Sequence, residues 1–451
     1  MNFRLLIIFA VLVRIIAFVY FVMIEGQYMT FDSPPYLNLA ENLIDNQVFS
    51  TSKQLPFSAH IWRTPGYPFF LALISLLGMK SLYWVVFWQE LVYGIFAYIF
   101  YHYGKPVFGD RIAKIALIFL MIEPGGLAFP KLIMTETLFM PFLLGGILAI
   151  GYYLRQLHWR YMFIAGLLMG VGALVRPAIL YLPIVVAGVL LAFDFFNRKR
   201  WLHVGIFFGA FILALSPWLI RNYSHYQQIY ISGQSSYGLA YFHVPFVLEA
   251  EKNMPFDAGW EYVGEKIRHK SGQLTQSQGS PVSPLQVHEI EKQVALEELA
   301  KYPSTYAKRW LIGMLKGMSS PLIIELYDAY KIQRDERLHL LEEITNAGGI
   351  VPGVGYYLLH QDKLYLFDVI FSLFLAVFAL LGALNITFRK DCFLWIMMLT
   401  TFYFISIPGP FGHGRFRVPV ELFWFIQACI GFIWVNEIVG KWRNRKNRIE
   451  D

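Results

Sequence analysis

The chain has 451 residues, of which 57% are hydrophobic, 18% aromatic and only 15% charged. This balance excludes an ordinary soluble globular protein and predicts an integral membrane protein. The formal net charge of +7 is explained by basic loops that stay on the cytoplasmic side of a membrane, so it does not indicate nucleic-acid binding.

Ten stretches are apolar over about the 20 residues that a membrane-spanning helix requires. In chain order they are residues 3–24, 81–103, 112–130, 133–154, 160–177, 178–196, 202–220, 364–387, 391–411 and 417–437. The first is interpreted as an uncleaved helix, because it carries Arg14 and lacks an Ala-x-Ala-like cleavage site. We therefore predict an all-α polytopic membrane protein with about ten transmembrane helices.

Basic residues predict the orientation of these spans. With the amino terminus inside, alternate connections are basic and stay in the cytoplasm. They carry Lys105, Arg111 and Lys114; Arg155 and Arg160; Arg198, Lys199 and Arg200; and Arg389 and Lys390. Residues 65–78 are apolar but too short to cross, and a crossing there would reverse every later loop. We expect them to form a shallow or re-entrant helix on the outer side.

This topology divides the chain into four parts. They are an N-terminal transmembrane module (1–221) with its first outer loop at 25–64, an extracytoplasmic domain (222–363), C-terminal transmembrane helices (364–440) and a basic cytoplasmic tail (441–451). The outer domain is predicted to be modest in size and mixed in secondary structure. It has weak alternation at 227–241, a flexible loop at 273–284, a charged helix at 286–300 and an amphipathic interfacial helix at 302–318.

The first outer loop contains the best candidate for chemistry, Asp32. Ser33 is a good N-cap and Pro34 suits the first helical position, so a short surface helix should follow. Asp32 then lies at the amino end of this helix, where the helix dipole favours an ionised carboxylate. Two roles remain open: assistance with capping, or a general base that faces a substrate.

Other ionisable side chains lie at the outer ends of predicted spans, where each is costly and marks a candidate site. If arginines from several spans converge at one leaflet, they build a phosphate site, because guanidinium groups bind phosphate oxygens in pairs. Simpler roles are also open: a Lys131 ion pair with a nearby glutamate, arginine side chains that snorkel, or a local pair of Arg417 with Glu421.

Six ordered segments resemble the signatures of GT-C glycosyltransferases, most closely the protein O-mannosyltransferase and aminoarabinose-transferase-like group (glycosyltransferase family 39-like). They are Asp32 with residues 36–43, then 63–68, 134–139, 175–177, 217–223 and 414–419. The similarity covers residues 1 to about 437 and weakens within 240–300. It implies a multi-spanning enzyme that transfers a sugar from a polyprenyl-phosphate donor, with inversion, to a glycan, lipid or protein acceptor on the outer face.

The resemblance also implies roles for residues of this chain. Asp32 matches the catalytic acid of the first outer loop, and Glu136 matches an acidic position near the second. From their own place at the outer ends of the spans, we expect the donor phosphate to be held by Arg63, Lys131, Arg176, Arg221 and Arg415, with polar support from Tyr36, Glu123, His413 and Arg417. Many relatives have a second acidic residue directly after the first, whereas Ser33 follows here. We therefore expect neither a metal nor a cofactor.

Two other functions fit the same composition: a transporter or flippase of lipid-linked sugars, and a ligase or polymerase of surface glycans. The candidate charges cluster at one leaflet instead of the membrane midplane, which favours an enzyme over a transporter. No Walker or dinucleotide-binding motif appears, so a lipid-linked donor is favoured over a nucleotide sugar. The compact chain and modest outer domain are typical of a bacterial inner-membrane protein.

Overall fold

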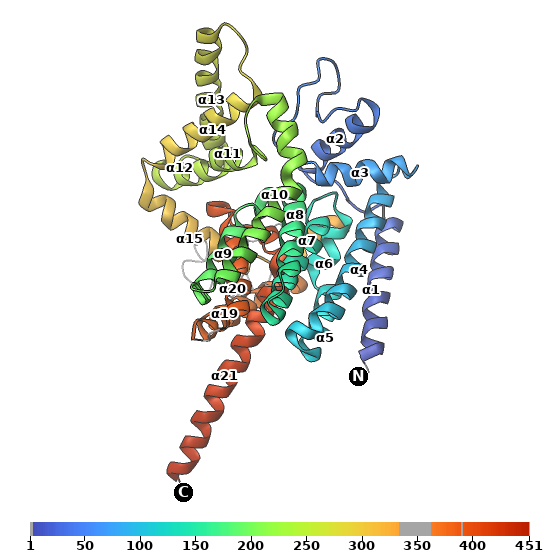
Figure 1. The fold of residues 1–451 in the computed structure, drawn as a ribbon, viewed down its shortest axis with the longest axis vertical. Coiled ribbons are helices and arrows are strands. Elements are labelled where there is room, and N and C mark those ends of the chain that lie inside the picture. Colours follow the sequence, from blue (N-terminus) through green and yellow to red (C-terminus); the bar gives the residue numbers. More distant parts are fainter. Residues whose placement is uncertain (1–2, 333–361, 389–390, 451) are drawn as a thin grey trace.

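A computed structural model of the chain describes residues 3–332, 362–388 and 391–450. These residues form helices and connecting loops, and no strand occurs among them, so the predicted all-α class is confirmed (Figure 1). Residues 333–361 of the predicted outer domain and the predicted inner loop Arg389–Lys390 lie outside the described residues.

Within the described ranges, six helices are long and apolar enough to cross a membrane, which makes the chain an integral, multi-pass membrane protein. They are α1 (Phe3–Met23), α4 (Leu82–Phe108), α7 (Glu136–Gln156), α10 (Arg198–Tyr226), α19 (Lys363–Phe388) and α21 (Glu421–Glu450). A seventh span is possible if α5 (Asp110–Ile122) and α6 (Pro124–Ala128), which meet at a bend of 52°, count as one.

Of the four shorter apolar helices among the described residues, three lie in the predicted stretches: α8 (Trp159–Val175), α9 (Leu182–Phe193) and α20 (Cys392–Ser406). Each of the ten predicted stretches therefore contains a helix. Within the described part of the chain only six or seven reach spanning length, so the number ten is not confirmed. The bend in the third stretch lies at Glu123, because Pro124 lacks the N–H that would continue α5.

The first outer loop contains the short helix α2 (Ser33–Asp45), and the apolar segment 65–78 that follows it contains α3 (Gly66–Leu76). The 11 residues of α3 extend about 16 Å, roughly half of the hydrocarbon thickness, as expected for a segment that does not cross. The helices pack against each other, and Tyr36 of α2 meets Tyr67 of α3 edge to face at 5.1 Å.

The described part of segment 222–363 is helical, so the prediction of mixed secondary structure is wrong there. It comprises α11 (Gln234–Gly238), the π-helical turn η3 (Leu239–His243), α12 (Val244–Lys252), α13 (Phe256–Gln278), α14 (Pro284–Leu299), α15 (Pro303–Ser319) and α16 (Ile323–Ala329). The weak alternation at 227–241 was misleading because α11 and η3 are too short to show helical periodicity.

Two predicted helices of this segment are present as α14 and α15, whereas the predicted loop at 273–284 is shorter than expected. Helix α13 continues to Gln278 and ends at Gly279, whose φ of +69° suits glycine. Helices α12, α13 and α14 share a small apolar core that includes Val247, Val263 and Val294.

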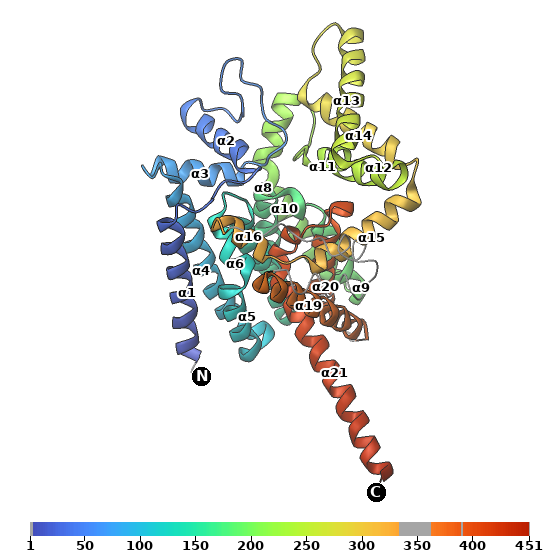
Figure 2. The same ribbon diagram turned by 180° about the vertical axis from the view of Figure 1, so that it is seen from behind.

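The views in Figures 1 and 2 agree on where these parts lie. Helices α2 and α3 and helices α11–α14 lie at one end of the molecule, and both chain termini lie at the opposite end. The loop before α3 is in direct contact with the residues before α11, because Gly233 N–H donates to the Ile61 carbonyl at 3.0 Å. The loop before α3 and the start of the helical segment therefore meet above the membrane-spanning bundle.

Candidate active site

Five charged side chains from distant parts of the sequence form one continuous chain of ion pairs, which we name the charge cluster. Its order is Arg63, Asp32, Arg415, Glu136 and Arg176. Arg63 Nη2 lies 2.6 Å from Asp32 Oδ1, and Arg415 Nη1 lies 2.7 Å from Asp32 Oδ2. Arg415 Nε also donates to Glu136 Oε1, which lies 2.5 Å from Arg176 Nη1. Three guanidinium groups and two carboxylates give the cluster a net charge of +1.

Ends of helices and short turns position these residues. Asp32 directly precedes α2, and Glu136 is the first residue of α7. Arg176 directly follows α8, and Arg415 lies in the 3₁₀ turn η5 (Gly414–Phe416) that precedes α21. Helix ends carry the unpaired backbone groups and the chain reversals, so the fold gathers polar residues at one end of an otherwise apolar bundle.

The capping role of Asp32 is ruled out by the geometry. Its side chain makes no hydrogen bond to the backbone at the start of α2. The predicted cap Ser33 is itself the first helical residue, and its hydroxyl donates to the Ile133 carbonyl at 2.9 Å. Both oxygens of Asp32 are instead occupied by guanidinium groups.

The charge cluster is accessible at one end and closed at the other. The side chains of Asp32, Arg415 and Arg63 are 21%, 23% and 14% exposed, whereas Arg176 is 9% exposed and Glu136 is completely buried. A ligand that approaches the cluster therefore meets Asp32, Arg415 and Arg63, and Glu136 lies behind the arginines.

The pKa of Asp32 is governed by two opposing influences. Burial favours the protonated acid and so raises the pKa, but the positive charges of Arg415 and Arg63 outweigh burial and hold the pKa of Asp32 well below its usual range. Asp32 is therefore ionised at neutral pH in this arrangement. A carboxylate with so low a pKa is a poor proton acceptor until its arginine partners change.

Tyr36 and Tyr67 support the accessible end of the cluster. The Arg63 guanidinium lies 4.6 Å above the Tyr36 ring and donates to the Tyr36 hydroxyl at 3.1 Å. Tyr67 packs against Tyr36 and donates to Gln89 Oε1 at 2.7 Å. The amide of Gln89 donates in turn to the backbone carbonyls of Pro130 and Leu132. Arg63 is thus held by a series of buried aromatic and polar contacts.

Arg221 lies outside the chain of ion pairs of the charge cluster, and His60 is the residue that the two share. Arg221 donates to Asn222 Oδ1 at 2.8 Å and lies 4.8 Å from the Trp218 ring centre. Among the described residues it has no ion-pair partner. His60, whose carbonyl accepts a weak hydrogen bond from Arg221 at 3.4 Å, connects it to the cluster. Burial, followed by the charges of Arg63 and Arg221, lowers the pKa of His60 to about 4.

Lys131 belongs to a second, separate group of charges. Its side chain is completely buried and lies 2.6 Å from Glu90 Oε1. Glu90 is also paired with Arg14 of α1, which donates to the Gly126 carbonyl at 2.9 Å. The predicted ion pair of Lys131 with a glutamate is therefore present, but the partner is Glu90 and not Glu123 or Glu136.

Three other predicted residues also lie outside the charge cluster. Glu123 accepts from the backbone N–H groups of Gly125 and Gly126, so it caps α6. Arg417 forms the predicted local pair with Glu421 and is buried. His413 accepts from the backbone N–H of Arg415 at 3.1 Å and so shapes the turn η5.

Sequence reasoning missed Glu90, Tyr67 and Gln89. Glu90 is an acidic residue inside a predicted span, and that position alone marks it as significant. Its partners Arg14 and Lys131 are 76 and 41 residues away, so no local pattern identifies the group. Gln89 and Tyr67 carry no sequence signal beyond their place in apolar surroundings.

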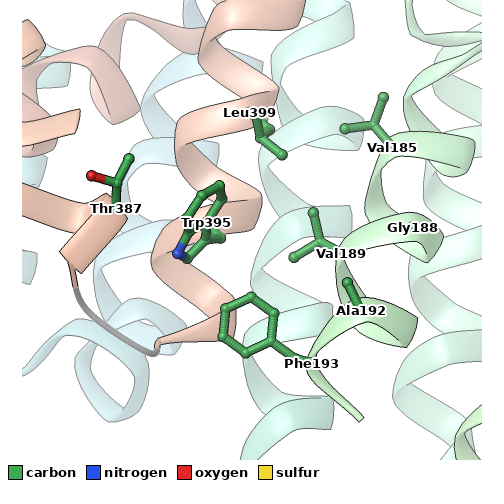
Figure 3. Close-up of a pocket in the computed structure, with 8 residues that line it drawn as sticks. All are labelled: Val185, Gly188, Val189, Ala192, Phe193, Thr387, Trp395 and Leu399. Atoms are coloured by element: carbon green, nitrogen blue, oxygen red, sulfur yellow. The ribbon is translucent and has the colours of Figure 1, made fainter. Parts of the chain in front are cut away.

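An apolar crevice of about 570 Å³ lies between α9 and α20 (Figure 3). It is lined mainly by aliphatic and aromatic side chains, among them Val185, Val189, Trp395 and Leu399. Arg176 precedes α9 and Arg415 follows α20, whereas the crevice lies toward the other ends of these helices. It offers no charged group to a phosphate, so we do not assign it as the site.

Residues 62–220 match the family described as dolichyl-phosphate-mannose-protein mannosyltransferase. This match contains Arg63, Glu136 and Arg176 of the charge cluster and confirms the predicted resemblance to GT-C glycosyltransferases. No curated protein matches the chain.

Solved structures with a similar arrangement include two kinds of protein. One is the archaeal oligosaccharyltransferase AglB from Archaeoglobus fulgidus in complex with an inhibitory peptide and a dolichol-phosphate, with 16% identity and a TM-score of 0.46 over 98% of this chain. The chain spans 52% of the length of AglB. The other is ArnT from Cupriavidus metallidurans bound to undecaprenyl phosphate, with 12% identity and a TM-score of 0.39 over 94% of this chain and 77% of ArnT. At such low similarity, residue roles are assigned from this chain alone.

Proposed function

We propose that this protein is a membrane glycosyltransferase that moves a hexosyl or pentosyl group from a polyprenyl-phosphate donor to an acceptor at the extracytoplasmic face of the membrane. The observation that carries the proposal is Asp32, an accessible carboxylate held between Arg63 and Arg415 at one end of a membrane-spanning bundle. The family match over residues 62–220 supports the same reaction class.

The proposed reaction forms one glycosidic bond, breaks the bond between the sugar and the donor phosphate, and moves one proton. An acceptor hydroxyl oxygen attacks the anomeric carbon of the sugar, and the bond from that carbon to the donor phosphate oxygen breaks with inversion. The transition state resembles an oxocarbenium ion, and the departing polyprenyl phosphate gains negative charge. Asp32 receives the proton of the hydroxyl, and guanidinium groups stabilise the leaving phosphate. If the acceptor is already an anion, Asp32 orients it instead.

Arg63 and Arg415 connect these two events. Arg63 and Arg415 donate hydrogen bonds to the two oxygens of Asp32. As long as no sugar donor competes for these arginines, the carboxylate has a weak tendency to accept a proton. Guanidinium groups bind phosphate at least as readily as carboxylate. When the donor phosphate binds, it competes for Arg63 and Arg415, and Asp32 becomes a stronger base. We therefore expect donor binding to precede activation of the acceptor.

Glu136 and Arg176 are assigned a positioning role. Glu136 is fully buried behind Arg415, so its carboxylate does not face the accessible side of the cluster. It holds Arg415 and Arg176 in fixed directions, which maintains the phosphate-binding end. Arg221, with no ion pair among the described residues and a position next to His60, is proposed as a further phosphate ligand.

The location of the cluster favours an enzyme over a transporter. Asp32 and Arg63 lie in loops at helix ends, and Glu136 starts a membrane-spanning helix, whereas a transport path requires polar groups near the membrane midplane. The basic inner loops support the extracytoplasmic placement of this end, and a bacterial inner membrane remains our proposal for the location. Membrane lipids would surround the bundle.

A transfer assay tests the function directly. Purified protein in lipid nanodiscs is mixed with undecaprenyl-phosphate-linked mannose, glucose, galactose and arabinose in separate reactions, together with extracted envelope glycans, lipids and peptides. We expect one donor to release undecaprenyl phosphate and one acceptor to gain the mass of the sugar. Movement of an intact donor across liposomes without cleavage would instead establish a transporter.

A further inference from the structure

Four partly exposed aromatic side chains, which we name the aromatic cluster, lie next to the charge cluster. They are Trp62, Tyr237 of α11, Tyr241 of η3 and Trp260 of α13. The ring centres of Trp62 and Tyr237 are 4.7 Å apart, those of Tyr237 and Tyr241 are 4.7 Å apart, and those of Tyr241 and Trp260 are 4.8 Å apart. Residues from the first outer loop and the helical segment therefore build one continuous surface.

Three of the four rings lie outside the protein core. Trp62, Tyr237 and Trp260 belong to none of the buried apolar clusters of the described residues, whereas Tyr241 packs against the core that α12, α13 and α14 share. All four rings remain partly exposed. The indole N–H groups and the tyrosine hydroxyls of the four rings make no hydrogen bond to any described residue. The rings also contact one another and Phe242, so what they offer is a shared, partly exposed apolar surface with unused polar groups.

A buried acid lies behind this surface. Glu291 of α14 is 2% exposed, and its Oε2 atom has no hydrogen-bond partner within the described chain. Burial raises the pKa of Glu291 to about 7. Burial also raises the pKa of Tyr237 to about 12, with further contributions from Tyr241 and from the negative charge of Glu291. The acid is therefore close enough to influence the tyrosine hydroxyls electrostatically.

The aromatic cluster is continuous with the candidate active site. Trp62 directly precedes Arg63, and Ser232 donates a hydrogen bond to the Trp62 carbonyl. Asp32 and Arg63 both influence the pKa of Tyr237. A molecule that lies on the rings is thus directed toward the one accessible end of the charge cluster.

We infer that the aromatic cluster binds the sugar rings of an oligosaccharide acceptor and holds its reacting end at Asp32. This inference rests on the proposed glycosyltransferase function and names the acceptor class for it. Pyranose rings have one face of C–H groups that packs on an aromatic face, and an edge of hydroxyls that pairs with polar groups. Four adjacent rings exceed the area of one sugar, which favours an acceptor of two or more units.

The polar groups on the rings argue against a lipid chain as the occupant. An acyl or isoprenoid chain would leave the two tyrosine hydroxyls and two indole N–H groups covered without partners, and each such group costs free energy. A saccharide instead supplies hydroxyl groups that donate and accept.

Saturation-transfer NMR and equilibrium binding test the inference on the full-length protein in nanodiscs. The probes are mannotetraose, cellotetraose, maltotetraose and chitotetraose, each compared with its monosaccharide. We expect at least one tetrasaccharide to bind about tenfold more tightly than its monosaccharide. Trp260→Leu and Tyr237→Leu should each weaken that binding about fivefold, since an aromatic contact contributes about 1 kcal/mol. Tyr237→Phe, which keeps the ring, should have a smaller effect.

Matched measurements separate this inference from the proposed function. Trp159→Leu removes another partly exposed tryptophan, at the opposite end of α8 from Arg176, and should leave saccharide binding unchanged. Binding of undecaprenyl phosphate should be unaffected by Trp260→Leu and Tyr237→Leu. If no tetrasaccharide binds while undecaprenyl phosphate does, the inference is overturned and the proposed function stands. Saccharide binding that is insensitive to both leucine variants overturns it as well.

Discussion

Replacing Asp32 with asparagine removes one negative charge from the charge cluster and keeps the size of the side chain. The net charge of the cluster changes from +1 to +2, because three guanidinium groups then face Glu136 alone. Phosphate binding should be unchanged or tighter. Turnover should fall by roughly 10² to 10⁴, the usual contribution of a general base. This range corresponds to about 3 to 5 kcal/mol of transition-state stabilisation.

The same substitution should leave the protein folded. The Asp32 side chain is 21% exposed, and the asparagine oxygen still accepts one hydrogen bond. We therefore expect a loss of no more than about 3 kcal/mol in the free energy of unfolding. Glu41→Gln is the matched control, because Glu41 is an exposed acid of the same helix α2.

The assay measures release of undecaprenyl phosphate from the donor that the wild-type protein cleaves, together with the affinity for undecaprenyl phosphate. We expect Asp32→Asn to lower kcat while the affinity is retained, and Glu41→Gln to change neither. Normal turnover by Asp32→Asn would refute the assigned role of Asp32. Equal losses of affinity and turnover would show that Asp32 contributes only to binding.

Three further predictions address the neighbouring groups. Because its arginine partners hold the pKa of Asp32 well below its usual range, the stability that this group contributes is present above the ordinary value of about 3.9 and is lost only as the pH falls through the lowered value. The value of kcat/KM for the donor, which reports the free enzyme, should show no acid limb from Asp32 above about pH 4, whereas kcat should show one if the donor phosphate removes its arginine partners. Profiles of rate against pH over a range of donor concentrations, from below KM to saturation, measure both. Lys131→Met leaves Glu90 with Arg14 as its one ion-pair partner and should lower the free energy of unfolding, measured by denaturant titration, by about 3 to 5 kcal/mol. The affinity for undecaprenyl phosphate should not change. A loss of affinity without a loss of stability would contradict the separate placement of Lys131. Arg221→Gln should weaken undecaprenyl phosphate binding about tenfold, since a charge-assisted hydrogen bond contributes about 1.5 kcal/mol or more, with little effect on thermal stability; unchanged affinity would exclude Arg221 as a ligand.

The membrane helices could be predicted from the sequence because each depends on a local run of apolar residues. All ten predicted stretches contain a helix. The bend at Glu123 was also marked locally, by Pro124 and the two glycines that follow it. The helical segment after α10 was predicted less well, because its first elements are only five residues long and display no full period.

The convergence of Asp32, Arg63, Glu136, Arg176 and Arg415 could be anticipated only in outline. Placing charged residues at the outer ends of spans brings them to the same leaflet, and these five do meet. Which residues pair is not encoded locally, since Asp32 and Arg415 are 383 positions apart. Lys131 was predicted at the same leaflet but pairs with Glu90 in the interior, because a buried cation requires an acid within reach.

The aromatic cluster illustrates a different limit of sequence reasoning. Tyr237 and Tyr241 are about one helical turn apart in sequence, and Trp260 lies on a separate helix, α13. This pattern is equally typical of a packed core. Their contact with Trp62 depends on how the first outer loop meets α11, and that meeting rests on backbone hydrogen bonds such as that from Gly233 to Ile61. No property of the four aromatic side chains indicates that the first outer loop and α11 meet.

A cryo-electron microscopy structure of the protein with undecaprenyl phosphate bound is the most direct test of the central claim. We predict phosphate oxygens within hydrogen-bond distance of Arg63 or Arg415, with Asp32 beside the phosphate and released from at least one of its arginine partners. A phosphate bound elsewhere, with Asp32 still held by both arginines, would contradict the account.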